Sequence, residues 1–429
     1  MIAEILLLVI SFLILLSIGV PVAWSIGISC LLTLAVSIDS LAAFTTMAQR
    51  MATGLDSFSL LAIPFFILAG QIMNQGGIAH RLINFAKALI GSMPGGLIYV
   101  NVIAAMLFGA ISGSAVAAAS AIGGILGPPM EKEKYSKEFG AAINVTASTT
   151  GLIIPPSNVL IVYSLASGGV SIASLFLAGY IPGILMGLAL MLVAAVWIKK
   201  KKYPPGEKTS AKKIATTFLD ALPSLLLLVV VIGGIVSGIF TATEASGIAV
   251  LYTLILATIY REINLKKLHK IFLSSVVTTS IVLLLIATSM GMSWVMSFEN
   301  IPQTVSDALL GLSDNKYVIL IIINLLLLFV GTFMDMTPAI LIFTPIFLPI
   351  MKSLGVDPVH FGMIMVMNLC VGLCTPPVGS VLFIGVGVAK TTIQKVMKPL
   401  LPLYIAMAII LLLVTYLPQI SLWLPGLFE

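Results

Sequence analysis

The sequence GLIIPP at residues 151–156 recurs in similar form 221 residues later, as GLCTPP at 372–377, and this repeat is the main evidence for the fold. Both copies lie inside long apolar runs, which cover residues 139–166 and 361–388. Proline has no backbone N–H and clashes with the preceding helical turn, so two successive prolines interrupt a helix. We therefore predict two discontinuous helices, each broken at its Pro-Pro pair.

The composition indicates an all-α integral membrane protein. The chain has 429 residues, of which 59% are hydrophobic and 9% are charged, and its mean hydropathy is +1.17. A soluble domain carries about 25% charged residues, so this composition excludes a water-soluble globular protein. A spanning helix needs roughly 20 apolar residues, which leaves room for about ten spans in a lipid bilayer. The net charge of +6 does not predict a nucleic-acid partner, because the basic residues lie at the ends of apolar runs.

The basic residues also predict how the chain is threaded through the membrane. If the amino terminus lies outside, 19 of the 22 Lys and Arg residues fall inside, as the positive-inside rule requires. This count holds only if the paired short apolar stretches, 95–130 and 317–351, each enter and leave on one side. We predict two re-entrant helical hairpins, with both termini periplasmic, in a bacterial cell inner membrane. Single spans are expected at 4–20, 22–38, 57–74, 172–198, 215–238, 243–260, 271–296 and 398–424.

The order of features predicts an inverted repeat. An amphipathic stretch, a hairpin and a broken span follow one another twice, and the two hairpins open to opposite sides. Inverted repeats are common in secondary transporters, with the binding site at mid-membrane. The predicted domains are N-terminal scaffold spans (1–56), a first repeat (57–198), a basic cytoplasmic loop with linking scaffold spans (199–270), and a second repeat (271–429).

The hairpin tips and helix breaks hold the candidate binding residues. Broken helices expose backbone carbonyls that coordinate Na⁺, and helix N-termini attract anionic groups of a solute. The candidate Na⁺ ligands are Ser112, Gly113, Ser114, Thr150, Gly151, Pro155, Thr332, Asp335, Gly372, Thr375 and Pro377. The candidate solute-binding residues are Ser112, Ser114, Asn158, Thr337 and Ser380.

Asp335 is the most informative of these residues. It is the only ionisable side chain between Lys316 and Lys352, and a charge at such depth is costly and usually functional. We interpret it as a cation ligand or a structural partner of the cation site. A helix-capping carboxylate and a proton-coupled role are the alternatives. Thr337 is expected to cap a helix whose first residue is Pro338.

The remaining polar residues give weaker signals. No Lys or Arg lies in the predicted core, so an anionic solute would be balanced by helix ends and co-bound cations, although a neutral solute is equally compatible. The three histidines, His80, His269 and His360, lie at span ends or in loops, where a solvated or interfacial position is expected.

At the tips and breaks the sequence resembles the large membrane subunit of tripartite ATP-independent periplasmic (TRAP) transporters. The segments that carry the resemblance are GAISGSA at 109–115, GLIIPPS at 151–157, GTFMD at 331–335 and GLCTPP at 372–377. The likeness extends over essentially the whole chain. It implies an elevator-type, Na⁺-coupled secondary active transporter that is not an enzyme. It also implies two partner proteins, a periplasmic substrate-binding protein and a separate small four-helix membrane subunit. The implied substrate is an organic acid, of the sialic acid or C4-dicarboxylate type, with sialic acid favoured.

Three other functions were weighed from the residues. A self-sufficient Na⁺/organic anion symporter with the same repeat plan is the alternative to the tripartite importer. An intramembrane enzyme is disfavoured because HExxH is absent, Asp335 is the only deep carboxylate, and no deep histidine accompanies Ser112 or Ser114. A channel remains an alternative, because half-helices also build selectivity filters.

Overall fold

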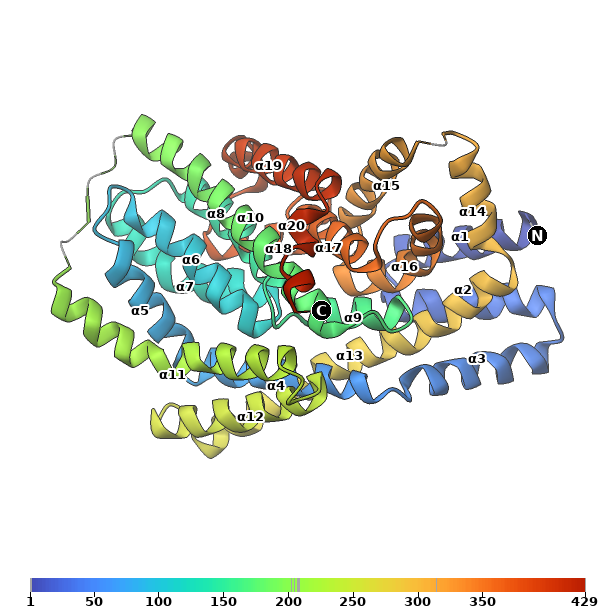
Figure 1. Cartoon of the computed structure of the whole chain (residues 1–429), viewed down its shortest axis with the longest axis horizontal. Helices are drawn as coiled ribbons and strands as arrows, with labels where there is room; N and C mark the ends of the chain where they lie inside the picture. Colours follow the sequence, from blue (N-terminus) through green and yellow to red (C-terminus); the bar gives the residue numbers. More distant parts are fainter. Residues whose placement is uncertain (1, 202, 204, 207–208, 314, 429) are drawn as a thin grey trace.

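The computed structural model describes residues 2–201, 203, 205–206, 209–313 and 315–428 (Figure 1). Over these residues the regular structure is helical, apart from one isolated bridge between Pro94 and Pro205. Seven helices of the described chain are long and apolar enough to span a membrane, and eight if one bent pair counts as a single span. The all-α membrane fold predicted from the sequence is therefore confirmed.

A first group of helices lies along the lower side of the molecule and at its right-hand end in Figure 1. We call this group the scaffold. Its members are α1 (Ile2–Ser17), α2 (Val22–Ser37), α3 (Ser40–Leu55), η1 (Phe58–Leu61), α4 (Ala62–Gln75), α11 (Ala211–Val236), α12 (Ala242–Ile259) and α13 (Leu265–Phe298).

Helix α3 was not predicted. The sequence assigned no helix between the spans at 22–38 and 57–74, because this segment mixes apolar residues with polar ones and has no long apolar run. The structure places α3 along α13, where the Arg50 guanidinium lies 5.3 Å from the centre of the Trp294 ring. A Cβ atom on Gly54 would lie only 2.6 Å from Cβ of Met290, so the two helices are in close contact there.

Two short amphipathic helices, α5 (Ile78–Ile90) and α14 (Ile301–Leu310), connect the scaffold to the hairpins. On α5, Nε of Arg81 lies 3.0 Å from Oδ1 of Asp220 on α11, and its guanidinium lies 3.5 Å from the centre of the Tyr260 ring. Helix α14 contacts α13 of the scaffold and α16 (Met336–Ser353) of the second hairpin. The two amphipathic stretches predicted from the sequence therefore form helices, and each contacts the scaffold.

A second group of helices contains the hairpins and the broken helices. The first half supplies α6 (Gly96–Ser112), α7 (Ala115–Lys132), α8 (Lys137–Ile153) and α9 (Asn158–Ala166), and the second supplies α15 (Lys316–Gly331), α16, α17 (Pro358–Leu373) and α18 (Ser380–Val388). Helices α8 and α9 meet at 52°. Both predicted interruptions are therefore present, and each contains a Pro-Pro pair with a cis peptide bond. The group is completed by α10 (Ile172–Lys201), α19 (Ile393–Tyr416), α20 (Gln419–Leu422) and η2 (Pro425–Leu427).

The two halves of this second group interlock. Within each half, the first hairpin helix contacts the first part of the broken helix, as α6 does with α8 and α15 with α17. Between the halves the partners are exchanged: α7 contacts α18, and α16 contacts α9. This reciprocal pattern is the one expected of two similar units related by a pseudo-two-fold axis.

Several basic segments gather at one end of the molecule. The α10–α11 connection, at the far left of Figure 1, forms the bridge of Pro205 with Pro94, which lies between α5 and α6. In the same connection the ring of Tyr203 stacks on that of Tyr135, between α7 and α8, with centroids 4.5 Å apart. These contacts bring the segments that follow Lys134 and Lys201 to the same end of the molecule, while Lys202 and Lys208 of the basic loop lie outside the described residues.

Candidate functional site at the hairpin tips and helix breaks

The tip of the first hairpin is seated against the break of its own half. Gly109 and Gly151 meet backbone to backbone, since a Cβ atom on Gly151 would lie 2.2 Å from Cα of Gly109. Gly113 ends α6 with φ of 62°, a left-handed conformation that favours glycine. A Cβ atom there would lie 2.7 Å from Nδ2 of Asn158, the first residue of α9. The tip and the start of α9 are therefore neighbours.

Ser114 organises the start of the return helix, α7. Its hydroxyl accepts a hydrogen bond from the backbone N–H of Ala117 at 3.2 Å, as an N-cap does. Ser112 is nearly buried, and its hydroxyl donates to the carbonyl oxygen of Ser114 at 3.5 Å. The start of α7 at Ala115, capped by Ser114, agrees with the sequence prediction.

We expect Ser114→Ala to raise the Na⁺ concentration needed for half-maximal uptake. The substitution also removes a cap worth about 1 kcal/mol, so a stability control is needed. Ser210→Ala supplies it, because the Ser210 hydroxyl caps α11 by accepting from the N–H of Lys213 at the same 3.2 Å. Uptake titrated with Na⁺ tests the prediction, and an equal response in the two variants would leave Ser114 with a capping role only.

The second tip repeats this arrangement with different residues. A Cβ atom on Gly372 would lie 2.5 Å from Cα of Gly331, so these glycines again bring two backbones together. The carbonyl oxygen of Thr332 accepts hydrogen bonds from the N–H groups of Val378 at 3.2 Å and Gly379 at 3.4 Å. The second tip is therefore joined directly to the second break.

The start of α16 differs from the prediction. The helix begins at Met336, so Asp335 occupies the N-cap position and Thr337 lies in the first turn instead of capping it. The expected start at Pro338 is wrong by two residues. The error arose because Thr337-Pro338 is a good capping pair in sequence, whereas the observed helix extends toward the tip. Asp335 is exposed and its side chain forms no capping hydrogen bond, so it takes the N-cap position of α16 through its place in the chain.

The two breaks come together through α8 and α17. The Cys370 thiol lies 3.4 Å from the carbonyl oxygen of Thr149, and the Cys374 thiol lies 4.0 Å from the Thr149 hydroxyl. Both thiols are buried and unoxidised. The breaks of the two halves are therefore adjacent in the interior, as a shared site requires.

The predicted site residues fall into two clusters. The first contains Ser112, Gly113, Ser114, Gly151 and Asn158, with Thr150 and Pro155 buried beside it. The second contains Thr332, Gly372 and Thr375, while Pro377 is exposed and Ser380 is half-buried at the start of α18. Among the described residues, no hydrogen bond or ion pair joins the side chain of Asp335 or Thr337 to either cluster.

The donor atoms at the breaks suit a hard cation such as Na⁺. They are carbonyl and hydroxyl oxygens, and the described residues contain no cluster of His, Cys, Asp and Glu that could hold a transition metal. The carbonyl of Leu152 accepts from the Ser157 hydroxyl at 2.5 Å, and that of Cys374 accepts from Tyr404, yet a carbonyl oxygen has a second lone pair. The buried hydroxyl oxygen of Ser380 has no hydrogen-bond partner in the part of the chain that the structure describes, so it is a candidate for ligand contact.

Four asparagines that the sequence analysis did not select join the hairpins to the broken helices. Nδ2 of Asn101 on α6 donates to Oδ1 of Asn144 on α8 at 3.5 Å, and Nδ2 of Asn368 on α17 donates to Oδ1 of Asn324 on α15 at 2.5 Å. All four are at most 3% exposed. The signal that could have found them is the presence of an Asn in each of the four matched apolar runs, where polar side chains are rare.

His360 also differs from its expected interfacial position. It is 2% exposed, with Nδ1 lying 2.7 Å from the Ser421 hydroxyl and Nε2 lying 3.3 Å from the carbonyl oxygen of Thr415. The sequence placed it at a span end, but α20 folds back over the start of α17 and covers it.

Comparison with known proteins identifies the family. Residues 9–420 match the family described as tripartite ATP-independent periplasmic transporter, DctM component. The chain is 59% identical over 418 residues to the uncharacterized protein YgiK of Salmonella typhimurium, covering 97% of this chain and 96% of that protein.

Two further relatives are named for the solutes of their transporters. The C4-dicarboxylate TRAP transporter large permease protein DctM of Rhodobacter capsulatus is 38% identical, over 95% of this chain and 96% of that protein. The sialic acid TRAP transporter large permease protein SiaM of Vibrio cholerae is 40% identical, over 89% of each.

A solved structure shares the fold. The YdaH transporter of Alcanivorax borkumensis superposes with a TM-score of 0.65 at 14% sequence identity, over 90% of this chain and 89% of that one. The match of nearly the whole chain to one sequence family, together with the helical membrane fold, shows that the chain belongs to the DctM component family of tripartite ATP-independent periplasmic transporters.

Proposed function

We propose that this protein is the large membrane subunit of a Na⁺-coupled importer of an organic acid, working in a bacterial inner membrane with both termini periplasmic. A periplasmic substrate-binding protein delivers the solute, and a small four-helix membrane subunit completes the complex. The observation that carries the proposal is the seating of each hairpin tip at the helix break of its own half. Such an arrangement places oxygen donors and helix N-termini together, away from lipid.

The division of helices supports an elevator mechanism. The interlocked hairpins and broken helices would move as one body against the scaffold, with α5 and α14 as linking arms. One contact that must break lies at the first tip, where a Cβ atom on Gly70 of α4 would lie 2.9 Å from the carbonyl oxygen of Ser112. Another joins α13 of the scaffold to α16 of the second hairpin.

The elevator can be tested by distance measurement between spin labels. We expect the distance between labels at Val116→Cys on α7 and Leu226→Cys on α11 to change when Na⁺ and solute are added. Both positions are exposed, and the native cysteines of the described chain are buried. A scaffold pair, Leu226→Cys with Leu251→Cys on α12, is the control and should keep its distance. Identical distances for the first pair in all conditions would contradict the elevator.

Reconstitution separates the tripartite importer from its alternative, a self-sufficient symporter. In proteoliposomes that contain this chain and the small subunit, we expect uptake only when a Na⁺ gradient and the cognate binding protein are both present. Full uptake without the binding protein would favour the symporter, and solute flux that does not saturate would favour a channel. A thermal-shift screen of the binding protein against organic acids supplies the substrate for this assay.

The substrate is proposed at the level of its chemical class. Relatives named for C4-dicarboxylates and for sialic acid are almost equally identical to this chain, at 38% and 40%. Both solutes are carboxylates, so an organic acid is the common proposal, and sialic acid is the first candidate for the screen.

A further inference from the structure

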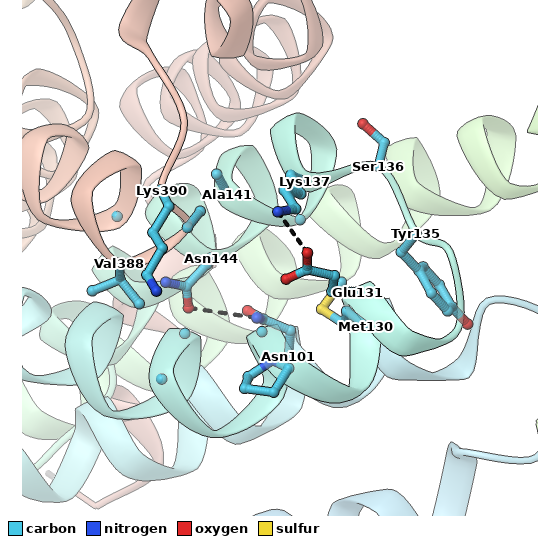
Figure 2. Close-up of a pocket in the computed structure, with 17 residues that line it drawn as sticks. Asn101, Met130, Glu131, Tyr135, Ser136, Lys137, Ala141, Asn144, Val388 and Lys390 are labelled. Carbon is cyan, nitrogen blue, oxygen red and sulfur yellow. Dashed lines mark hydrogen bonds and ion pairs between the residues drawn. The ribbon is translucent and has the colours of Figure 1, made fainter.

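A cavity of about 290 Å³ lies apart from the hairpin tips, at the basic end of the molecule (Figure 2). It is enclosed by α6, α7, the start of α8 and the end of α18. Its size is close to the lower limit of small-molecule pockets, about 300 Å³. Under the proposed orientation this end faces the cytoplasm, and the helices around the cavity come from both halves of the chain.

An unsatisfied acceptor lies in the wall of the cavity. Nδ2 of Asn144 donates to the carbonyl oxygen of Ala119 at 2.7 Å, which fixes the orientation of its amide. Its Oδ1 then accepts from Nδ2 of Asn101, so Oδ1 of Asn101 has no hydrogen-bond partner among the described residues, although Asn101 is only 1% exposed. Buried polar atoms are normally hydrogen-bonded, so this oxygen is available to a hydroxyl or amide donor from water or from a ligand.

Two glycines that line the cavity, Gly124 and Gly127, are not required by close contacts with neighbouring atoms. Cβ atoms on Gly124 and Gly127 of α7 would meet no atom within 4 Å. Glycine is among the weakest helix formers, and here neither close contact nor positive φ requires it. Larger side chains at these positions would project into the cavity. The glycines therefore preserve empty space, which a bound solute could occupy.

The mouth of the cavity carries one cation that the protein does not neutralise. Lys137 pairs with Glu131, their Nζ and Oε1 atoms lying 2.6 Å apart. Lys390 forms no ion pair with any described residue, and Figure 2 shows its side chain directed toward the Asn144 and Asn101 pair. A single uncompensated ammonium group beside hydrogen-bonding amides favours an anion.

We propose that this cavity binds a small organic anion, with its carboxylate or sulfonate against Lys390 and a hydroxyl or amide donor directed to Oδ1 of Asn101. It is a second solute site, distinct from the hairpin tips. That its occupant is the imported solute on its way to the cytoplasm rests on the function proposed above. The anion-binding property itself does not depend on that function.

The backbone at Lys390 allows a substitution that should not damage the fold. Lys390 has φ of 50°, a left-handed conformation that favours glycine, so Lys390→Gly removes the charge and relieves the backbone. Lys134→Gly is the matched control, because Lys134 follows the C-cap residue of α7 as Lys390 follows that of α18, has φ of 61°, and does not line the cavity. Lys390→Arg restores the charge.

The test places a thiol in the wall, as Gly127→Cys, and measures its modification in inside-out membrane vesicles. Two membrane-impermeant reagents are compared, an anionic sulfonatoethyl methanethiosulfonate and a cationic trimethylammonium methanethiosulfonate. We expect the anionic reagent to be favoured by about tenfold relative to free thiol, because a charged cleft concentrates its counter-ion. Lys390→Gly should abolish this preference, whereas Lys134→Gly and Lys390→Arg should keep it. N-acetylneuraminate, malate and isethionate are then tested for protection of the thiol, with neutral N-acetylmannosamine as control.

The outcomes separate the two proposals. An equal loss of preference in Lys390→Gly and Lys134→Gly, or no greater protection by any of the three anions than by the neutral sugar, overturns the anion site. If the preference and the protection persist but Na⁺-dependent uptake with the binding protein cannot be found, the site stands and the proposed import fails. Filling the cavity by Gly127→Leu should block uptake, whereas Gly247→Leu on α12, whose Cβ also meets open space, should not.

Discussion

We expect Gly151→Ala to reduce uptake to background. The new Cβ atom would lie 2.2 Å from Cα and 2.5 Å from the carbonyl carbon of Gly109, and neither backbone atom can rotate away as a side chain could. Overpacking of this kind costs about 1–3 kcal/mol when the surroundings relax. Relaxation here means moving the first hairpin away from the break, which disrupts the tip. Uptake and thermal unfolding of the purified complex measure the two effects separately.

A matched glycine distinguishes this effect from a general response to alanine. Gly247 of α12 has open space around its Cβ position, and alanine is the better helix former by about 1 kcal/mol. Gly247→Ala should therefore keep both uptake and stability. The corresponding change in the second half, Gly372→Ala, should reproduce the loss because its Cβ would lie 2.5 Å from Cα of Gly331. Wild-type uptake by Gly151→Ala would show that the hairpin and the break separate freely.

We expect Asp335→Ala to raise the Na⁺ concentration for half-maximal uptake by at least about tenfold, which corresponds to about 1.4 kcal/mol of binding free energy. The carboxylate lies at the second hairpin tip, exposed and without a capping bond, so it is available to a cation. Uptake measured over a range of Na⁺ concentrations, at saturating solute and binding protein, gives the shift.

Two further variants serve as controls for the Na⁺ dependence of Asp335→Ala. Asp307→Ala removes an exposed carboxylate from the arm helix α14 and should leave the Na⁺ dependence unchanged. Asp335→Asn keeps an oxygen donor but no charge, and should give an intermediate shift if the carboxylate is a ligand. An unaltered Na⁺ dependence in Asp335→Ala would remove this residue from the cation site.

The repeated Pro-Pro pair made much of the second helix group predictable. Proline acts locally, so its effect on a helix can be read without knowing the partners, and both interruptions are where the sequence placed them. The caps at Ser114 and the glycine at 113 are local signals of the same kind. The contacts of Gly109 with Gly151 and of Gly331 with Gly372 could be found only in the structure, because a sequence does not show which backbone segments lie in contact.

The failures have physical causes too. Helix α3 is stabilised by its contacts with α13 and not by a long apolar run of its own. A search for long apolar runs therefore does not detect it. Thr337-Pro338 is a favourable capping pair in the sequence, but α16 begins two residues earlier, at Met336, closer to the hairpin tip. The capping preference alone therefore predicted the wrong first residue. Lys390 resembled a topology determinant in sequence, and only the structure places it at the mouth of a cavity.

The exchanged contacts of α7 with α18 and of α16 with α9 have a consequence for biosynthesis. The first hairpin is complete once residue 132 has been synthesised, and roughly 250 more residues must be translated before α18 is available to contact α7. At about 5–20 residues per second this takes some tens of seconds. During that interval the surface of α7 that contacts α18 in the finished structure has no partner from the chain. Neither half of the gene product can mature alone, so the order of synthesis becomes part of how this protein reaches its final state.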